Sequence, residues 1–189
     1  MELPAENMHY TFADCLSWPE NLRCELIEGT AVMMDMPPRV HQTVVMEIFR
    51  QLANFLEGKE SEVYLGPFAV RLFEKGDDSP SDIDTMVEPD ISVICDQDKL
   101  DKYGCKGAPD LIIEVLSPST QRHDRLVKLG LYQKAGVREY WIVDPDLQTV
   151  QVNLLRDGRF EPIEVYTAEA VAKVNVLDGC FVELPKVFA

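Results

Sequence analysis

Two carboxylates in this 189-residue chain interrupt segments that otherwise have the apolar character of buried strands. Asp90 opens the segment PDISVI, and Glu114 lies inside LIIEVL. An acid that is buried without a partner is costly, so each carboxylate needs a compensating charge. A hard divalent cation held by oxygen ligands is the usual partner where several acids converge. A salt bridge to a nearby arginine is the alternative.

Lys128, on the following helix, is the next candidate for a residue of the site. Side-chain alternation predicts that Glu114 and Leu116 point to the same face of their strand. Asp124 and Lys128 are four residues apart and share a helix face, so Lys128 could lean over the strand that carries Glu114. The alternative for Asp124 and Lys128 is a surface ion pair, which contributes little to stability.

Three residues nearer the N-terminus are further candidates. His41 begins the first long helix, a position where a histidine is more often solvated or near the helix cap than part of an active site. Glu25 and Glu28 lie on an expected hairpin and are candidate outer members of an acidic cluster. Exposed acids are the commoner case on a hairpin.

These residues need a scaffold, and the residue pattern predicts a mixed α/β chain. Apolar residues at helical spacing predict a helix over 41–56, and a second helix is expected over about 121–135, closed by Gly136. The expected strands are a hairpin within 25–35, a strand over 63–73, strands that begin at Pro89 and Leu111, the segment EYWIVD, and a C-terminal hairpin of 149–155 and 160–165. We expect helices packed on a central sheet in a single domain, 1–189, with its core at about 22–167.

The composition indicates the cellular compartment in which the protein is expected. The five cysteines are scattered and contain no C-x-x-C pair, which argues against a disulfide framework or a zinc site. The chain has neither a secretion signal nor a long apolar run, so a cytoplasmic protein without a membrane segment is expected.

Charge argues against a nucleic-acid partner. The net charge of −15 should repel a polyanion overall. Between Arg122 and Arg138, however, five basic residues meet only Asp124 as an acid, so a basic segment could still face DNA.

Several motifs resemble a known superfamily of nucleases. The order of elements, Pro89-Asp90 and Glu114-x-Leu116 look like the PD-(D/E)XK restriction-endonuclease-like superfamily. The strings CELIEG, GPFAVRL, PDLIIEVLSPST and LYQKAGVREYWIVDP are similar to the Uma-two family of bacterial restriction-endonuclease-like proteins. The resemblance extends from roughly Tyr10 to Phe181.

The resemblance implies a three-layer core and a DNA endonuclease in which Asp90 and Glu114 hold Mg²⁺ or Mn²⁺ while a lysine assists phosphodiester hydrolysis. The chain departs from the motif at Leu116, where the superfamily has lysine. We expect Lys128 to replace that lysine, with Asp124 as its orienting partner. A homodimer is expected by analogy with related double-strand cutters. The rival interpretation is a catalytically silent interaction or DNA-binding module with the same fold.

Overall fold

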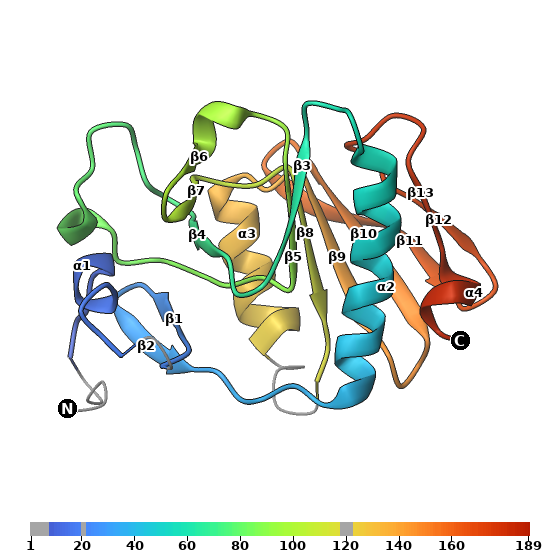
Figure 1. The fold of residues 1–189 in the computed structure, drawn as a ribbon, viewed down its shortest axis with the longest axis horizontal. Helices are drawn as coiled ribbons and strands as arrows, with labels where there is room; N and C mark the ends of the chain where they lie inside the picture. Colours follow the sequence, from blue (N-terminus) through green and yellow to red (C-terminus); the bar gives the residue numbers. More distant parts are fainter. Residues whose placement is uncertain (1–7, 20–21, 118–122) are drawn as a thin grey trace.

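A six-stranded mixed sheet forms the centre of the molecule in the computed structural model, which describes residues 8–19, 22–117 and 123–189 (Figure 1). The strands lie in the order β11-β10-β9-β8-β5-β3, with β8 and β9 parallel and the other neighbours antiparallel. Their bounds are Glu62–Leu65 (β3), Ile91–Ile94 (β5), Leu111–Val115 (β8), Glu139–Asp144 (β9), Thr149–Arg156 (β10) and Arg159–Thr167 (β11).

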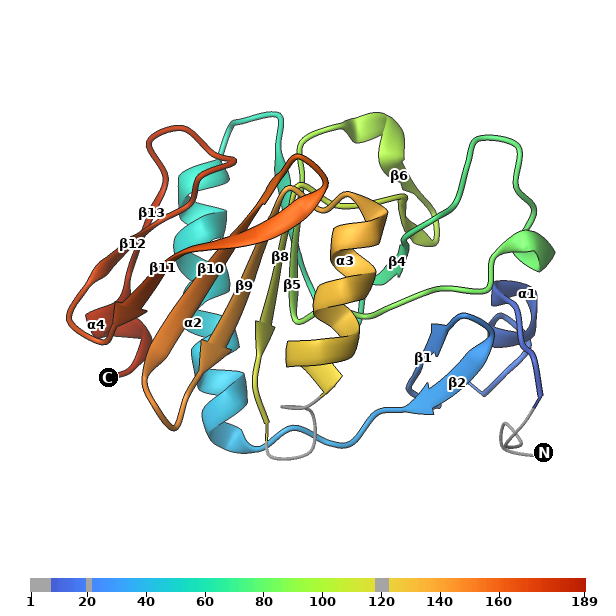
Figure 2. The same ribbon diagram turned by 180° about the vertical axis from the view of Figure 1, so that it is seen from behind.

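Two helices cover opposite faces of this sheet. Helix α2 (Arg39–Leu56) lies in front of the strands in Figure 1, and α3 (Leu129–Ala135) lies in front of them in the reversed view of Figure 2. A π-helical segment, His123–Lys128, leads directly into α3. The helix, sheet and helix therefore form three layers.

Helix α2 follows from its apolar periodicity. The side chains that it buries recur at the spacing of one helix face, which makes this face a stripe directed at the sheet. They are His41, Val44, Val45, Ile48, Leu52 and Leu56. The helix begins at Arg39, directly after Pro37 and Pro38, two residues before the expected start.

Strand β8 is buried on both faces. Its side chains alternate between two apolar clusters, one on each side of the sheet. Leu111, Ile113 and Val115 join the apolar cluster beneath α2. Ile112 and Leu116 join the cluster beneath α3. Glu114 belongs to the α3 side by the same alternation, so a charged residue lies among side chains that exclude water.

Smaller elements surround the central layers. The N-terminal hairpin of β1 (Cys24–Ile27) and β2 (Thr30–Met33) was expected and is confirmed, and it lies beside the short helix α1 (Phe12–Cys15). The other elements are β4 (Ala69–Arg71), β6 (Leu100–Asp101), β7 (Gly104–Lys106), β12 (Val171–Lys173), β13 (Phe181–Glu183), α4 (Leu184–Val187) and two 3₁₀ turns, Pro80–Asp82 and Gln97–Lys99. Buried apolar side chains between Ala172 and Val187 also join the cluster beneath α2.

The strand expected over 63–73 is wrong, because it is two strands in different sheets. Strand β3 pairs with β5, whereas β4 pairs with β7, and the chain turns between them at Gly66 and Pro67. A Cβ on Gly66 would lie 2.8 Å from the carbonyl oxygen of Pro89, so only glycine fits this approach. β-Branched composition predicted extended backbone but could not show this break.

Two other expectations need adjustment. The C-terminal hairpin at 149–155 and 160–165 was expected as an addition to the central sheet, but β10 and β11 are strands of that sheet itself. For the helix expected over 121–135, the described part begins at His123, and residues 121 and 122 lie outside the described residues. The helix ends as expected at Gly136, which has φ 90°.

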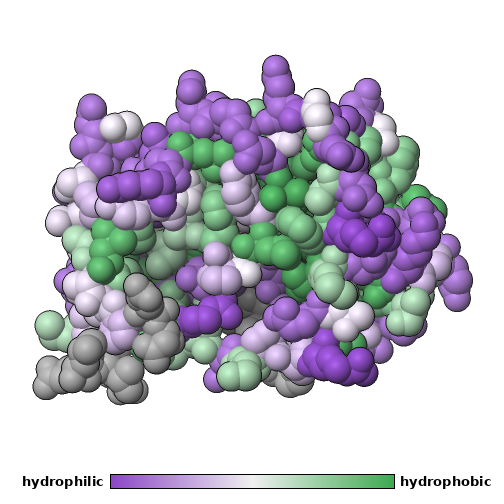
Figure 3. All heavy atoms as spheres, viewed as in Figure 1, coloured by the Kyte–Doolittle hydropathy of each residue, from purple (hydrophilic) through white to green (hydrophobic). Residues whose placement is uncertain are grey.

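Hydrophilic and apolar residues are unevenly distributed over the surface. On the face seen in Figure 1, hydrophilic residues dominate the rim and apolar residues gather toward the middle (Figure 3). No helix among the described residues combines the length and apolar character needed to cross a membrane.

Packing of α2 on the sheet should carry much of the stability. Leu52 is fully buried, so Leu52→Ala should lower the free energy of unfolding by about 2–5 kcal/mol. Leu147 is 70% exposed, and Leu147→Ala should change it by less than about 0.5 kcal/mol. Urea denaturation of the two variants compares them directly. Equal effects would contradict the assigned packing.

Candidate active site

The pairing of β5 with β8 brings the two candidate carboxylates together. In this antiparallel pair Ile91 lies opposite Ile113, so the next step of the register sets Asp90 opposite Glu114. The backbone N–H of Asp90 accordingly lies 3.4 Å from Oε2 of Glu114. Residues far apart in the chain thus meet at one end of two central strands.

Asp90 is held through one of its two carboxylate oxygens. Oδ2 accepts a hydrogen bond from the backbone N–H of Val115 at 2.8 Å and lies 3.1 Å from Nε2 of His41. A carboxylate accepts hydrogen bonds, so Nε2 is the donor. Oδ1 has no hydrogen-bond partner in the part of the chain that the structure describes, and the side chain is 23% exposed. One oxygen is therefore fixed while the other can bind a ligand.

His41 is itself buried, at 5% exposure. Its second ring nitrogen, Nδ1, is buried and makes no hydrogen bond to any described residue. Since His41 sits in the first turn of α2, the start of that helix positions Asp90. The expectation that a histidine here is more often solvated does not apply.

Glu114 is neutralised from the α3 side of the sheet. Nζ of Lys128 lies 2.8 Å from Oε1 of Glu114, and the hydroxyl of Tyr132 donates to the same oxygen at 2.6 Å. Burial, followed by the negative charges of Glu114 and Glu25, raises the pKa of Tyr132 well above its usual value. Tyr132 therefore keeps its proton and acts as a donor.

Glu25 completes an ion triad. Its Oε1 lies 2.9 Å from Nζ of Lys128 and accepts a hydrogen bond from the backbone N–H of Glu88. The side chains of Glu25, Lys128 and Glu114 are each no more than 4% exposed. The β1–β2 hairpin therefore contributes a buried carboxylate to the site.

The site lies in a pocket with a volume of about 120 Å³. The four residues Asp90, Glu114, Lys128 and His41 line it. The rest of the lining is Arg23, Met34, Asp35, Met36, Pro37, Gln42, Val45, Met46, Leu65, Gly66, Val115 and Ser117. The pocket lining therefore combines charged side chains with three methionines.

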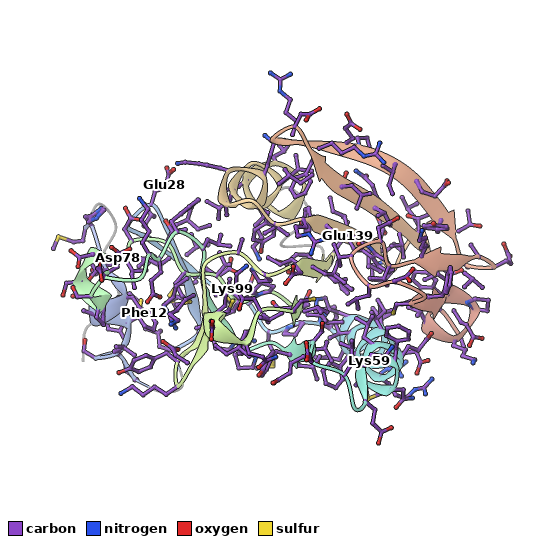
Figure 4. All side chains as sticks on the ribbon, turned by 90° about the horizontal axis from the view of Figure 1, so that it is seen from above. Phe12, Glu28, Lys59, Asp78, Lys99 and Glu139 are labelled. Atoms are coloured by element: carbon purple, nitrogen blue, oxygen red, sulfur yellow. The ribbon has the colours of Figure 1, made fainter. Side chains whose placement is uncertain are left out.

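Not every candidate residue belongs to this site. Glu28 is 67% exposed and lies 3.4 Å from Nζ of Lys134, and Figure 4 shows it at the outer edge of the molecule. The side chain of Asp124 lies outside the described residues, so its role as orienting partner stays a prediction. Sequence reasoning missed Tyr132, although it lies one helical turn beyond Lys128 and could have been found from that spacing.

The residues present fit a hard divalent cation. Carboxylate oxygens are the ligands that Mg²⁺ and Mn²⁺ prefer, and Asp90 and Glu114 supply them from adjacent strands. Asp90 offers an oxygen that accepts no hydrogen bond from any described residue. No cluster of three or more His, Cys, Asp or Glu side chains suitable for a metal occurs among the described residues, so substrate or water would complete the coordination.

Comparison with solved structures finds a protein with the same fold. The chain superposes with a TM-score of 0.73 on a crystal structure from Anabaena variabilis described as "a putative nuclease belonging to DUF820". The two sequences are 24% identical, and the match covers 95% of this chain and 97% of the other. At this identity the likeness shows the fold.

The family follows from the sequence match. The model of the Uma2 family, described as "Putative restriction endonuclease", matches residues 12–184, so the chain belongs to that family, as the motifs predicted. An uncharacterised Synechocystis protein, slr1290, is 27% identical over 119 residues. That match covers 62% of this chain and 58% of the Synechocystis protein, so the chain spans little more than half of that relative.

Removal of the buried ammonium of Lys128 should lower the stability of the fold. In Lys128→Met the two buried carboxylates lose their shared cation, so the free energy of unfolding should fall by about 3–5 kcal/mol. Adding Glu25→Gln should recover part of this loss because one unpaired charge is removed. Urea denaturation measures both.

The matched control is Lys134→Met. Lys134 is 67% exposed, and its loss should change the free energy of unfolding by less than about 0.5 kcal/mol. Equal stability of the Lys128 and Lys134 variants would refute the triad as a stabilising unit.

Proposed function

We propose that the protein is a DNA endonuclease that hydrolyses phosphodiester bonds with the help of Mg²⁺ or Mn²⁺. One observation carries the proposal: Asp90 and Glu114 meet at the end of adjacent central strands with Lys128 at 2.8 Å from Glu114, in a pocket. Membership of the restriction-endonuclease family supports it. The fold that this chain shares with the Anabaena protein supports it as well, because it favours a restriction-endonuclease-like core as the interpretation of the three layers.

Asp90 and Glu114 are the residues that would hold the cation. When bound, the cation would supply Lewis-acid stabilisation of the negative charge on the phosphate oxygens. His41 and the Val115 N–H fix Oδ2 of Asp90, which keeps the carboxylate in one orientation. Such preorganisation lowers the cost of assembling the site around substrate.

Lys128 is the residue that replaces the motif lysine. Leu116 occupies the motif position and is buried in the apolar cluster beneath α3, so it has no polar role. The Lys128 ammonium reaches the same region from the π-helical segment and also lines the pocket. There it would stabilise the charge that develops on the scissile phosphate, or orient the attacking water.

The acidic surface limits how DNA would bind. A net charge of −15 disfavours long-range attraction to a polyanion, so binding should be weak at physiological salt and depend on local bases. Arg23 lines the pocket and pairs with Glu88 at 3.0 Å. The sequence between Arg122 and Arg138 adds the basic residues that flank Lys128.

A second candidate function is a silent interaction module that assembles as a homodimer. The observation in its favour is that Lys128 already pairs with Glu25 and Glu114, so the triad could serve stability alone. Exposed apolar side chains on β11, β12 and β13 offer a dimer surface. They are Val165, Val171 and Phe181, each more than half exposed.

Cleavage assays decide between the two functions. Supercoiled and single-stranded DNA would be incubated at low salt with Mg²⁺ or Mn²⁺ and either wild type or Glu114→Gln. We expect metal-dependent cleavage by wild type and a loss of at least about 100-fold in the variant, because a ligand for the cation becomes neutral.

Glu161→Gln is the matched control, since Glu161 is 56% exposed on β11 and should leave cleavage unchanged. Equal inactivity of folded wild type and Glu114→Gln on every substrate would reject the nuclease and favour the interaction module.

A further inference from the structure

We propose that the candidate active site acts on unpaired DNA, because apolar side chains at the mouth of its pocket form a surface on which the bases of a single strand can stack. We call this surface the methionine rim, and it consists of Met36, Met46 and Leu65. This substrate class rests on the proposed nuclease function, since a phosphodiester must reach Asp90 and Glu114. The substrate would be DNA that is single-stranded or locally unpaired.

Three separate elements build the methionine rim. Met36 lies in the segment between β2 and α2, Met46 lies on α2, and Leu65 is the last residue of β3. Figures 1 and 2 show the segment between β2 and α2 running past the end of β8 to the start of α2. All three side chains line the same pocket as Asp90 and Glu114. The apolar surface is therefore continuous with the carboxylate site.

Exposure rises from the floor of the pocket to its mouth. The side chain of Glu114 is 4% exposed and that of Asp90 is 23% exposed. On the rim, Leu65 is 37%, Met46 is 62% and Met36 is 94% exposed. Unpaired nucleotides can turn their bases out of the stack, which paired nucleotides do only at a cost in free energy. A single strand can therefore lower its backbone toward the carboxylates while its bases remain on the rim.

The charges of the pocket disfavour a duplex. Binding of duplex DNA draws on several lysine and arginine contacts to phosphates. Among the described residues, the bases that line the pocket are Arg23 and Lys128, and Lys128 is engaged with Glu25 and Glu114. Arg23 is 39% exposed and is the lining cation that can meet a phosphate. On a protein with a net charge of −15, contacts to the bases must then supply much of the affinity.

Exposed bases on and after α3 do not change this balance. Lys134 pairs with Glu28, and Arg138 pairs with Asp110. Neither Lys134 nor Arg138 lines the pocket. Their charges are therefore partly offset and lie outside the site.

The residue types on the rim suit contact with bases of any kind. Methionine is unbranched and polarisable, so its side chain adapts to surfaces of different shape. Apolar side chains, methionine and leucine among them, pack against unstacked bases in complexes with DNA. Every base has a flat face, so such contacts need no particular sequence. We expect a preference for single strands with little dependence on sequence.

Fluorescence anisotropy tests the proposal on the full chain, with a labelled single strand and the same strand annealed to its complement. Ca²⁺ replaces Mg²⁺ because it takes the same carboxylate oxygens, and a denaturing gel checks that the strand stays intact. Wild type should bind the single strand at least about tenfold more tightly than the duplex. The double variant Met36→Ala, Met46→Ala should bind the single strand at least about fivefold more weakly, because it loses stacking side chains, and the duplex as wild type does.

Met33→Ala is the matched control. Met33 is 51% exposed on β2 and does not line the pocket, so its loss should leave both affinities unchanged. The double variant Met36→Leu, Met46→Leu keeps apolar side chains on the rim and should bind the single strand as wild type does. A loss of affinity in Met33→Ala equal to that in the double alanine variant would overturn the assignment of the rim.

Binding and cleavage separate this proposal from the nuclease itself. Single-strand binding with the predicted pattern, but without cleavage in any metal, would support the rim and reject only the hydrolysis. Metal-dependent cleavage by a wild type that binds duplex as tightly as single strand would overturn the proposed substrate class and leave the nuclease standing. A dimer that the double alanine variant dissociates would also overturn it, because a second copy would then cover the rim.

Discussion

The negative charge of Glu114 inside a strand that is buried on both faces is the constraint on which the site depends. Strand β8 has apolar neighbours above and below, so an unpaired carboxylate there would cost several kcal/mol. The chain offsets that charge with the ammonium of Lys128 and the hydroxyl of Tyr132, and Glu25 pairs with the same ammonium. This charge arrangement forms only if elements from three separate parts of the chain are positioned together.

The fold meets that need through two connections. The parallel pairing of β8 with β9 requires a crossover, and the crossover supplies the π-helical segment and α3 with Lys128 and Tyr132. On the other face, α2 begins beside the same strand ends and brings His41 to Asp90. The two helical segments thus contact different carboxylates: the π-helical segment and α3 bring Lys128 and Tyr132 to Glu114, and α2 brings His41 to Asp90.

Much of this could be predicted from the sequence, because the signals were local. Periodicity located α2, alternation put Glu114 and Leu116 on one face of their strand, and the motifs identified the family. The burial of Glu25 and the break of β3 from β4 at Gly66 could not be predicted. Both depend on contacts between distant segments, the ion pair of Glu25 with Lys128 and the approach of Gly66 to Pro89.

The cation site that we propose at Asp90 and Glu114 can be tested directly by Mn²⁺ binding, without any DNA. The electron paramagnetic resonance signal of free Mn²⁺ would be followed during titration with wild type, Asp90→Asn and the control Asp146→Asn, an exposed aspartate beyond β9. The account predicts binding by wild type and the control, and at least about tenfold weaker binding by Asp90→Asn, since loss of even an outer-shell partner costs that much. Equal affinity of wild type and Asp90→Asn, or no binding by either, would contradict it.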